Sequence, residues 1–250
     1  MKEVLLLLYF TFLGYYGIGQ SPQKIDSIRD ILTIKSQSND TSQLRFLYQE
    51  LGWEYFVEAK YDSSLTYFQK SLNQPNGESN KVMKADAMFG IGWTYFKLNE
   101  YASSIEYLVP ALHMQEELND KASAAKNGNI LGVALKSLGN YDIALHYYKQ
   151  AFLLNKELNQ TLQQGYNYQN IGVVYGERGQ YDSAITYYEQ AIEFYREINN
   201  TLNTTMVYYN IGHCYFNMGD YIKALDSYLQ ALDFSKKAQS IYWEGESLNA

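Results

Sequence analysis

The sequence has few of the residues on which metal sites, disulfide frameworks and nucleic-acid binding depend. Its 250 residues include one cysteine, three histidines and three prolines. The single cysteine, Cys214, excludes a disulfide within the chain and predicts a small buried thiol. The formal net charge is −7, and no block of lysine or arginine interrupts it. Nucleic acids and anionic membrane surfaces are therefore not expected partners, because nothing would neutralise their phosphates.

Catalytic and cofactor-binding motifs are missing as well. His113, His146 and His213 are far apart in the sequence, and none has a second histidine three or four residues away, as a helical metal site requires. The chain has no glycine-rich phosphate loop, no nucleophile elbow and no His-Glu-x-x-His motif. We therefore expect no enzymatic activity, no metal and no cofactor within these 250 residues.

The sequence does contain one pattern that recurs five times at a spacing of 40 residues, without insertion or deletion. A glycine column and a tyrosine column mark it: Gly52, Gly92, Gly132, Gly172 and Gly212, and Tyr61, Tyr101, Tyr141, Tyr181 and Tyr221. A period of this length is typical of stacked supersecondary units. Such an array offers an extended surface, so a binding partner is a better expectation than a reaction.

Each repeat has the pattern of two helices joined by a tight turn, because its apolar residues recur at steps of three, four and seven. The tyrosine column marks the start of the second helix. The glycine column falls inside the first helix, where glycine costs up to about 1 kcal/mol relative to alanine. We therefore expect the second helix to approach closely at each glycine, through a column of small residues: Ser64, Ser104, Ala144, Ala184 and Ala224.

The order of glycine, tyrosine, alanine or serine, and aromatic residues resembles the tetratricopeptide repeat over residues 41–240. The unit is longer than the standard repeat of about 34 residues and resembles the long-helix variants of the family. The resemblance implies an all-α, right-handed α-solenoid of stacked antiparallel helix pairs. Its five units would be 41–80, 81–120, 121–160, 161–200 and 201–240, with an amphipathic capping helix at 22–38 and the start of a truncated sixth unit at 241–250.

The N-terminal residues differ in kind from the repeats. A charged start, an apolar run from Val4 to Leu13, and small residues at Gly17 and Gly19 predict a secretory signal peptide at residues 1–19. An uncleaved membrane anchor is the alternative, because the uncharged stretch from Val4 to Gln23 is just long enough to span a bilayer. Both readings place the repeats outside the cytoplasm, in the periplasm or the extracellular space.

A signal peptide followed by a short helix and long tetratricopeptide units is similar to the extracytoplasmic part of bacterial membrane sensors. In those proteins a membrane helix and a histidine kinase or helix-turn-helix regulator follow the repeats. This resemblance implies a non-catalytic scaffold that binds a peptide or protein segment and is tethered to the membrane by sequence beyond residue 250. A free-standing secreted or periplasmic adaptor for assembling protein complexes is the alternative function.

Departures from the repeat pattern mark a first group of candidate ligand-binding residues. In tetratricopeptide arrays the first helix of each unit forms most of the concave face. Two columns of that helix hold large aromatic residues in the first two units, and mostly smaller or polar residues later: Trp53, Phe56, Trp93 and Phe96. These rings would form a hydrophobic platform for a peptide. Packing between units near the capped end is the alternative role.

A second candidate group surrounds the asparagine that precedes the Ile-Gly pair in two units. The amides of Asn170 and Asn210 suit the backbone of an extended peptide, because each offers both a donor and an acceptor. In long-helix members of the family a similarly placed asparagine contacts bound peptide. Gln169, Tyr209 and His213 lie close by in a helix. Hydrogen bonding between neighbouring helices is the alternative role for this group.

Removal of residues 1–19 on export would leave Gln20 as the first residue. We expect N-terminal sequencing of the full chain, expressed in a bacterium that secretes it, to read from Gln20. A secreted product that still begins at Met1 would contradict cleavage and favour the membrane anchor.

Overall fold

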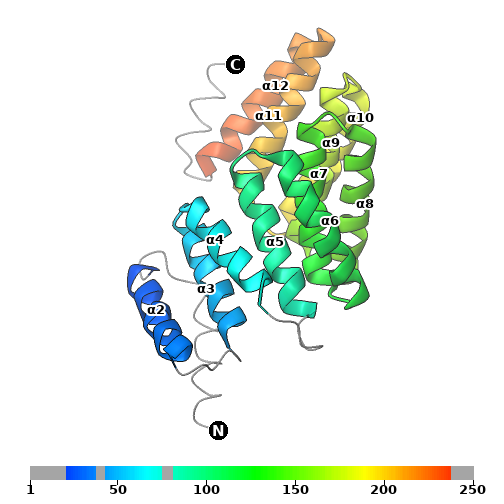
Figure 1. Cartoon of the computed structure of the whole chain (residues 1–250). Coiled ribbons are helices and arrows are strands. Elements are labelled where there is room, and N and C mark those ends of the chain that lie inside the picture. Colours follow the sequence, from blue (N-terminus) through cyan, green and yellow to red (C-terminus); the bar gives the residue numbers. More distant parts are fainter. Residues whose placement is uncertain (1–20, 38–42, 75–80, 238–250) are drawn as a thin grey trace. The chain divides into compact units, whose positions relative to one another are not determined.

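The computed structural model describes residues 21–37, 43–74 and 81–237 (Figure 1). The predicted signal peptide and the predicted start of a sixth unit lie outside these ranges. Within them the regular structure is helical: α2 (Ser21–Gln37), α3 (Leu44–Val57), α4 (Tyr61–Leu72), α5 (Lys81–Lys97), α6 (Tyr101–Glu117), α7 (Lys121–Ser137), α8 (Tyr141–Glu157), α9 (Thr161–Glu177), α10 (Tyr181–Glu197), α11 (Thr201–Met218) and α12 (Tyr221–Lys237). The prediction of an all-α helical-repeat solenoid is confirmed.

The chain forms two compact units, divided between Leu98 and Asn99. In the first unit α2 packs on α3, α3 on α4, and α4 on α5. In the second unit each helix from α6 to α12 packs on the next one along the chain. The division falls inside the second 40-residue repeat, between its two helices. None of the described helices is both long enough and apolar enough to cross a membrane.

The tyrosine column begins the second helix of each repeat, as the sequence predicts: α4, α6, α8, α10 and α12 all start at it. The turn before that column needs a left-handed residue, and Gly139, Gly179 and Gly219 supply it with φ of 77°, 72° and 82°. Asparagine ends the second helix of three repeats in the same left-handed conformation, with φ between 54° and 56° at Asn119, Asn159 and Asn199.

Four glycines of the column, Gly52, Gly132, Gly172 and Gly212, lie against aromatic rings, and here the sequence-based expectation needs correction. A Cβ atom added at Gly172 would lie 2.7 Å from the ring of Tyr188, and one at Gly52 would lie 2.7 Å from the ring of Phe68. Small residues of the second helix therefore do not fill the space opposite the glycines. Ser64, one of those small residues, instead donates a hydrogen bond of 2.9 Å to the carbonyl oxygen of Gly52. The ring needs the room that a side chain on the first helix would take.

Buried amide pairs join successive repeats in the second unit. Asn127 of α7 donates a hydrogen bond of 3.0 Å to the side-chain oxygen of Gln115 in α6. One repeat later, Asn155 of α8 donates a hydrogen bond of 2.7 Å to Asn167 of α9. All four side chains are almost completely buried. Because an unpaired buried amide costs about 1–3 kcal/mol, these pairs favour one alignment of each helix on the next.

The helix predicted at 22–38 is α2, and it covers one side of α3. Ile25 and Ile28 are buried in a cluster with Leu47, Leu51 and Tyr55. The apolar face of this lone helix therefore completes the core of the first unit.

Gly132 and Gly128 lie one turn apart on α7 and provide a matched test of the ring contact. An alanine Cβ at Gly132 would lie 2.7 Å from Cδ1 of Tyr148, whereas at Gly128 its nearest neighbours would be 3.7 Å away. We expect Gly132→Ala to lower the free energy of unfolding by about 1–3 kcal/mol, because the ring is fully buried. Gly128→Ala should raise it by up to about 1 kcal/mol, because alanine favours the helix. Urea unfolding followed by circular dichroism measures both changes, and equal effects would contradict the ring contact.

Candidate functional site

Aromatic side chains of the first unit gather around Trp53. Its ring centroid lies 5.8 Å from that of Trp93, 5.6 Å from Phe56 and 4.9 Å from Phe68. Phe89 joins the group at 5.5 Å from Trp93. The two tryptophans meet edge to face, with an interplanar angle of 69°, so they are not stacked on each other. We call Trp53, Phe56, Phe89 and Trp93 the aromatic cluster.

The aromatic cluster is held by the core and still offers surface to solvent. Phe68, on which Trp53 rests, is fully buried, and Phe89 is 6% exposed. The four residues that the sequence singles out in this unit are half-buried: Trp53, Phe56, Trp93 and Phe96. The rings therefore contribute to packing between the repeats, which is the alternative role that the sequence left open. Their exposed sides form an apolar surface. Edge-to-face pairs contribute about 0.5–1.5 kcal/mol beyond area burial, which fixes their geometry.

Two of the candidates in the second unit bond neighbouring helices. Gln169 is 9% exposed, and its side-chain oxygen accepts a hydrogen bond of 2.7 Å from the hydroxyl of Tyr195 in α10. Asn170 is half-buried and donates a hydrogen bond of 3.0 Å to Asn129 of α7. These contacts are the alternative role that the sequence leaves open for asparagine and glutamine at this position.

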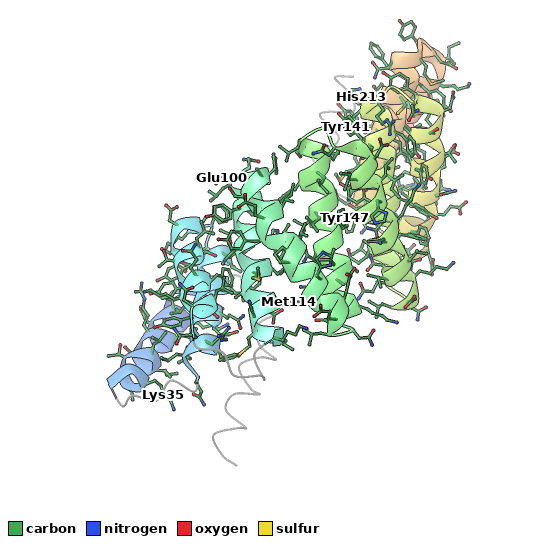
Figure 2. All side chains as sticks on the ribbon, turned by 45° about the vertical axis from the view of Figure 1, so that its right-hand side comes forward. Lys35, Glu100, Met114, Tyr141, Tyr147 and His213 are labelled. Atoms are coloured by element: carbon green, nitrogen blue, oxygen red, sulfur yellow. The ribbon has the colours of Figure 1, made fainter. Side chains whose placement is uncertain are left out.

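The other candidates of the second unit lie on α11 and are more accessible. Tyr209 meets His213 edge to face, with ring centroids 4.6 Å apart, and the two rings lie 5.6 Å and 5.8 Å from Tyr228. His213, labelled in Figure 2, is exposed, whereas Tyr209 and the neighbouring Asn210 are half-buried. An amide, an imidazole and a phenol ring therefore share one edge of this helix.

Sequence reasoning missed Phe89 and Asn129 as members of these sites. Both residues lie in the column that also holds Gln169 and Tyr209, because the four positions are 40 residues apart. Reading that column through all repeats would have found them. Tyr228 was missed for another reason, since its column reads as packing in every repeat.

Ionisable groups in the core of the second unit are held in their uncharged forms. Burial raises the pKa of the Cys214 thiol to about 11, and the prediction of a buried thiol is confirmed. Burial also raises the pKa of the Tyr188 and Tyr195 hydroxyls above their ordinary value. Among the described residues, no group of three or more histidine, cysteine, aspartate or glutamate side chains could hold a metal ion.

Family models identify the chain. Models described as tetratricopeptide repeat match residues 85–117, 122–197 and 206–237. The chain therefore belongs to the tetratricopeptide repeat family, whose fold is typically a non-catalytic scaffold for protein interaction. The first repeat, at 41–80, lies outside the matched residues. No curated protein matches the sequence.

Solved structures share the fold at low sequence identity. MamA is 21% identical over 80% of this chain and 97% of its own, with a TM-score of 0.61. BtubC (BKLC) from P. vanneervenii is 17% identical over 89% of this chain and 91% of its own, with a TM-score of 0.73. A plasmid's Rap conjugation gene regulator, in complex with a Phr peptide, is 18% identical over 81% of this chain, with a TM-score of 0.59. This chain covers only 56% of that regulator. Identities this low establish the fold alone.

The buried Cys214 thiol should react slowly with Ellman's reagent, because the thiolate is the nucleophile. With a pKa of about 11 in the folded protein and about 8.5 in the unfolded chain, the folded thiol is far less ionised at pH 7. We expect reaction roughly 300-fold slower in the native protein than in urea, in proportion to the fraction of thiolate at pH 7. Similar rates in the two states would show that Cys214 is accessible.

Proposed function

We propose that the chain is a non-catalytic scaffold that captures an extended peptide segment of a partner protein outside the cytoplasm. The aromatic cluster is the observation that carries the proposal. Its half-buried tryptophan and phenylalanine rings offer an apolar surface on the first helices of two successive repeats. Aromatic residues of this kind supply much of the binding energy at protein interfaces.

The geometry of the cluster supports binding because its rings are already fixed. Trp53 is held between the buried Phe68 and the edge of Trp93. Phe56 packs on Trp93 with ring centroids 4.9 Å apart. A partner would not have to immobilise these side chains, and each side chain ordered on binding costs about 0.5–1.5 kcal/mol. We therefore expect apolar side chains of the partner to settle on this surface.

The edge of α11, in the second unit, is proposed as a separate contact region for a peptide segment of its own. The Asn210 amide would pair with the backbone of a bound segment, while Tyr209 and the exposed His213 would flank it. Gln169 and Asn170 would hold α9 in place through their hydrogen bonds to Tyr195 of α10 and Asn129 of α7. The Rap regulator offers a parallel, since a protein with this fold was solved with a Phr peptide bound.

The proposal includes export and a sensory role. The apolar run from Val4 to Leu13 supports export. The order of signal peptide, short helix and long repeats supports the sensory part of a longer membrane signalling protein. The reading frame beyond residue 250 tests this role. A membrane-spanning segment followed by a histidine kinase or DNA-binding domain is the expected result, whereas an early stop codon would favour the free-standing adaptor.

Random peptides displayed on phage, panned on the full chain, test the binding surface. We expect selection of peptides rich in apolar residues. Titration calorimetry should show that peptides bound at the aromatic cluster bind at least tenfold more weakly to Trp93→Ala, and that peptides bound at the edge of α11 bind at least tenfold more weakly to Asn210→Ala. A tenfold loss is about 1.4 kcal/mol, within the range of a single interface residue.

Val82→Ala is the matched control, because Val82 is 50% exposed on α5 and lies outside the aromatic cluster. This variant should bind the selected peptides unchanged. If Trp93→Ala and Asn210→Ala bind as tightly as the control while folding normally, the proposed surface is wrong. If they unfold instead, these side chains belong to the core.

A further inference from the structure

One position of the first helix carries a tyrosine in three of the five repeats, and in the fourth repeat its ring fills the space beside two second helices. Tyr168 of α9 lies 4.4 Å from Phe152 of α8 and 5.7 Å from Phe194 of α10, between ring centroids. One repeat later, Tyr208 of α11 stacks on Phe234 of α12 at 5.5 Å. At the same position of α7 the residue is Gly128. The ring that Tyr48, Tyr168 and Tyr208 supply in their repeats is therefore missing here, and the second repeat has Met88 at this position.

A cavity opens at the place of the missing ring. It has a volume of about 280 Å³ and lies between α6, α7 and α8. Leu112 and Leu154 line it where Phe152 and Phe194 stand one repeat later, and Tyr147, labelled in Figure 2, lines it where Tyr187 stands. We call this cavity the Gly128 pocket. Its apolar walls correspond to those that hold Tyr168 in the next repeat.

Room for an added group begins at the backbone of Gly128. A Cβ atom built there would have only ordinary contacts, 3.7 Å from Cβ of Ala151 and 3.7 Å from the carbonyl oxygen of Tyr147. By contrast, the glycine column proper is filled by rings that leave no such space. The glycine at this position thus leaves an open pocket in place of a packing contact.

The charge at the far end of the pocket is reversed relative to the filled site. Arg196 donates a hydrogen bond of 2.6 Å to the hydroxyl of Tyr208. The residue at the equivalent position of α6 is Glu116, which lines the Gly128 pocket. His113 lies 3.6 Å from Glu116, and Glu157, also in the lining, pairs with Lys121 at 2.7 Å. A carboxylate that faces the pocket accepts a phenol hydroxyl and attracts a cation.

We propose that the Gly128 pocket binds the tyrosine side chain of a peptide that carries arginine or lysine beside it. The guest ring takes the place that Tyr168 and Tyr208 occupy in their own repeats, and its hydroxyl donates a hydrogen bond to Glu116. The neighbouring cation lies near the carboxylate of Glu116, because that of Glu157 is already paired with Lys121. The pocket shares no residue with the surface proposed above, so the inference stands without that function.

Three short peptides test the guest. Titration by NMR of the full chain should show binding of acetyl-Arg-Tyr-Arg-amide, with shifts centred on α6, α7 and α8. Acetyl-Arg-Ala-Arg-amide should bind at least tenfold more weakly, because it lacks the ring. Acetyl-Glu-Tyr-Glu-amide should also bind at least tenfold more weakly, because its charges oppose those of the pocket. Equal binding of the first two peptides would overturn the proposal, and equal binding of the first and third would overturn the role of Glu116.

Two variants distinguish binding in the Gly128 pocket from non-specific binding of the peptide elsewhere on the surface. Gly128→Tyr supplies the ring that Tyr168 and Tyr208 supply in their repeats and should abolish binding of acetyl-Arg-Tyr-Arg-amide. Gly128→Ala leaves most of the cavity and serves as its control. Glu116→Arg, an exposed substitution, should reverse the preference between the arginine and glutamate peptides even if Gly128→Tyr does not fold. Unchanged binding by a folded Gly128→Tyr would refute the site. Trp93→Ala should leave this binding intact, so failure of the pocket and failure of the aromatic cluster are told apart.

Discussion

The contact on which four of the five repeats are built joins an aromatic ring of the second helix to a glycine of the first. Tyr148, Tyr188 and Tyr228 lie against Gly132, Gly172 and Gly212, respectively. The glycine costs the helix up to about 1 kcal/mol, whereas an aromatic side chain buries 150–250 Å², which at about 25 cal/mol per Å² outweighs that cost. Because the ring must lie where a Cβ would be, it sets how closely and in what rotation the two helices pack.

Contacts between repeats add the alignment that this ring contact cannot supply. Apolar rings tolerate small shifts along a helix, but the buried pairs Gln115–Asn127 and Asn155–Asn167 do not, because a shift would break the hydrogen bond that each pair makes. The structure thus combines two kinds of contact. Those within repeats depend mainly on the apolar area that the rings bury, and those between repeats depend on the direction of hydrogen bonds. Side chains such as Trp93 and His213 take part in neither set of contacts, and they are the ones that we propose for binding.

The sequence predicted where the helices begin better than it predicted which side chains contact one another. The helix starts at the tyrosine column follow from a local pattern and were predicted correctly. The residue opposite each glycine was not predicted correctly. A ring and a small side chain of the second helix both fit the spacing, and only the rotation of that helix about its axis in the packed structure decides which of them faces the glycine. The same limit affects the candidate site. Gln169 looks like an available amide until the Tyr195 hydroxyl, on the next helix, is placed against it.

The Gly128 pocket has a consequence for how arrays of this kind acquire specificity. In most proteins a new binding pocket must be shaped by several added side chains, each with its own cost in packing. In a repeat array the neighbouring copies already hold the shape, and one copy gains it by losing a single side chain. The guest ring then fits the space that the missing ring would fill. A residue at the end of the pocket, such as Glu116, decides which guests are accepted. A binding pocket can therefore arise from the absence of one side chain, without any change in the positions of the helices.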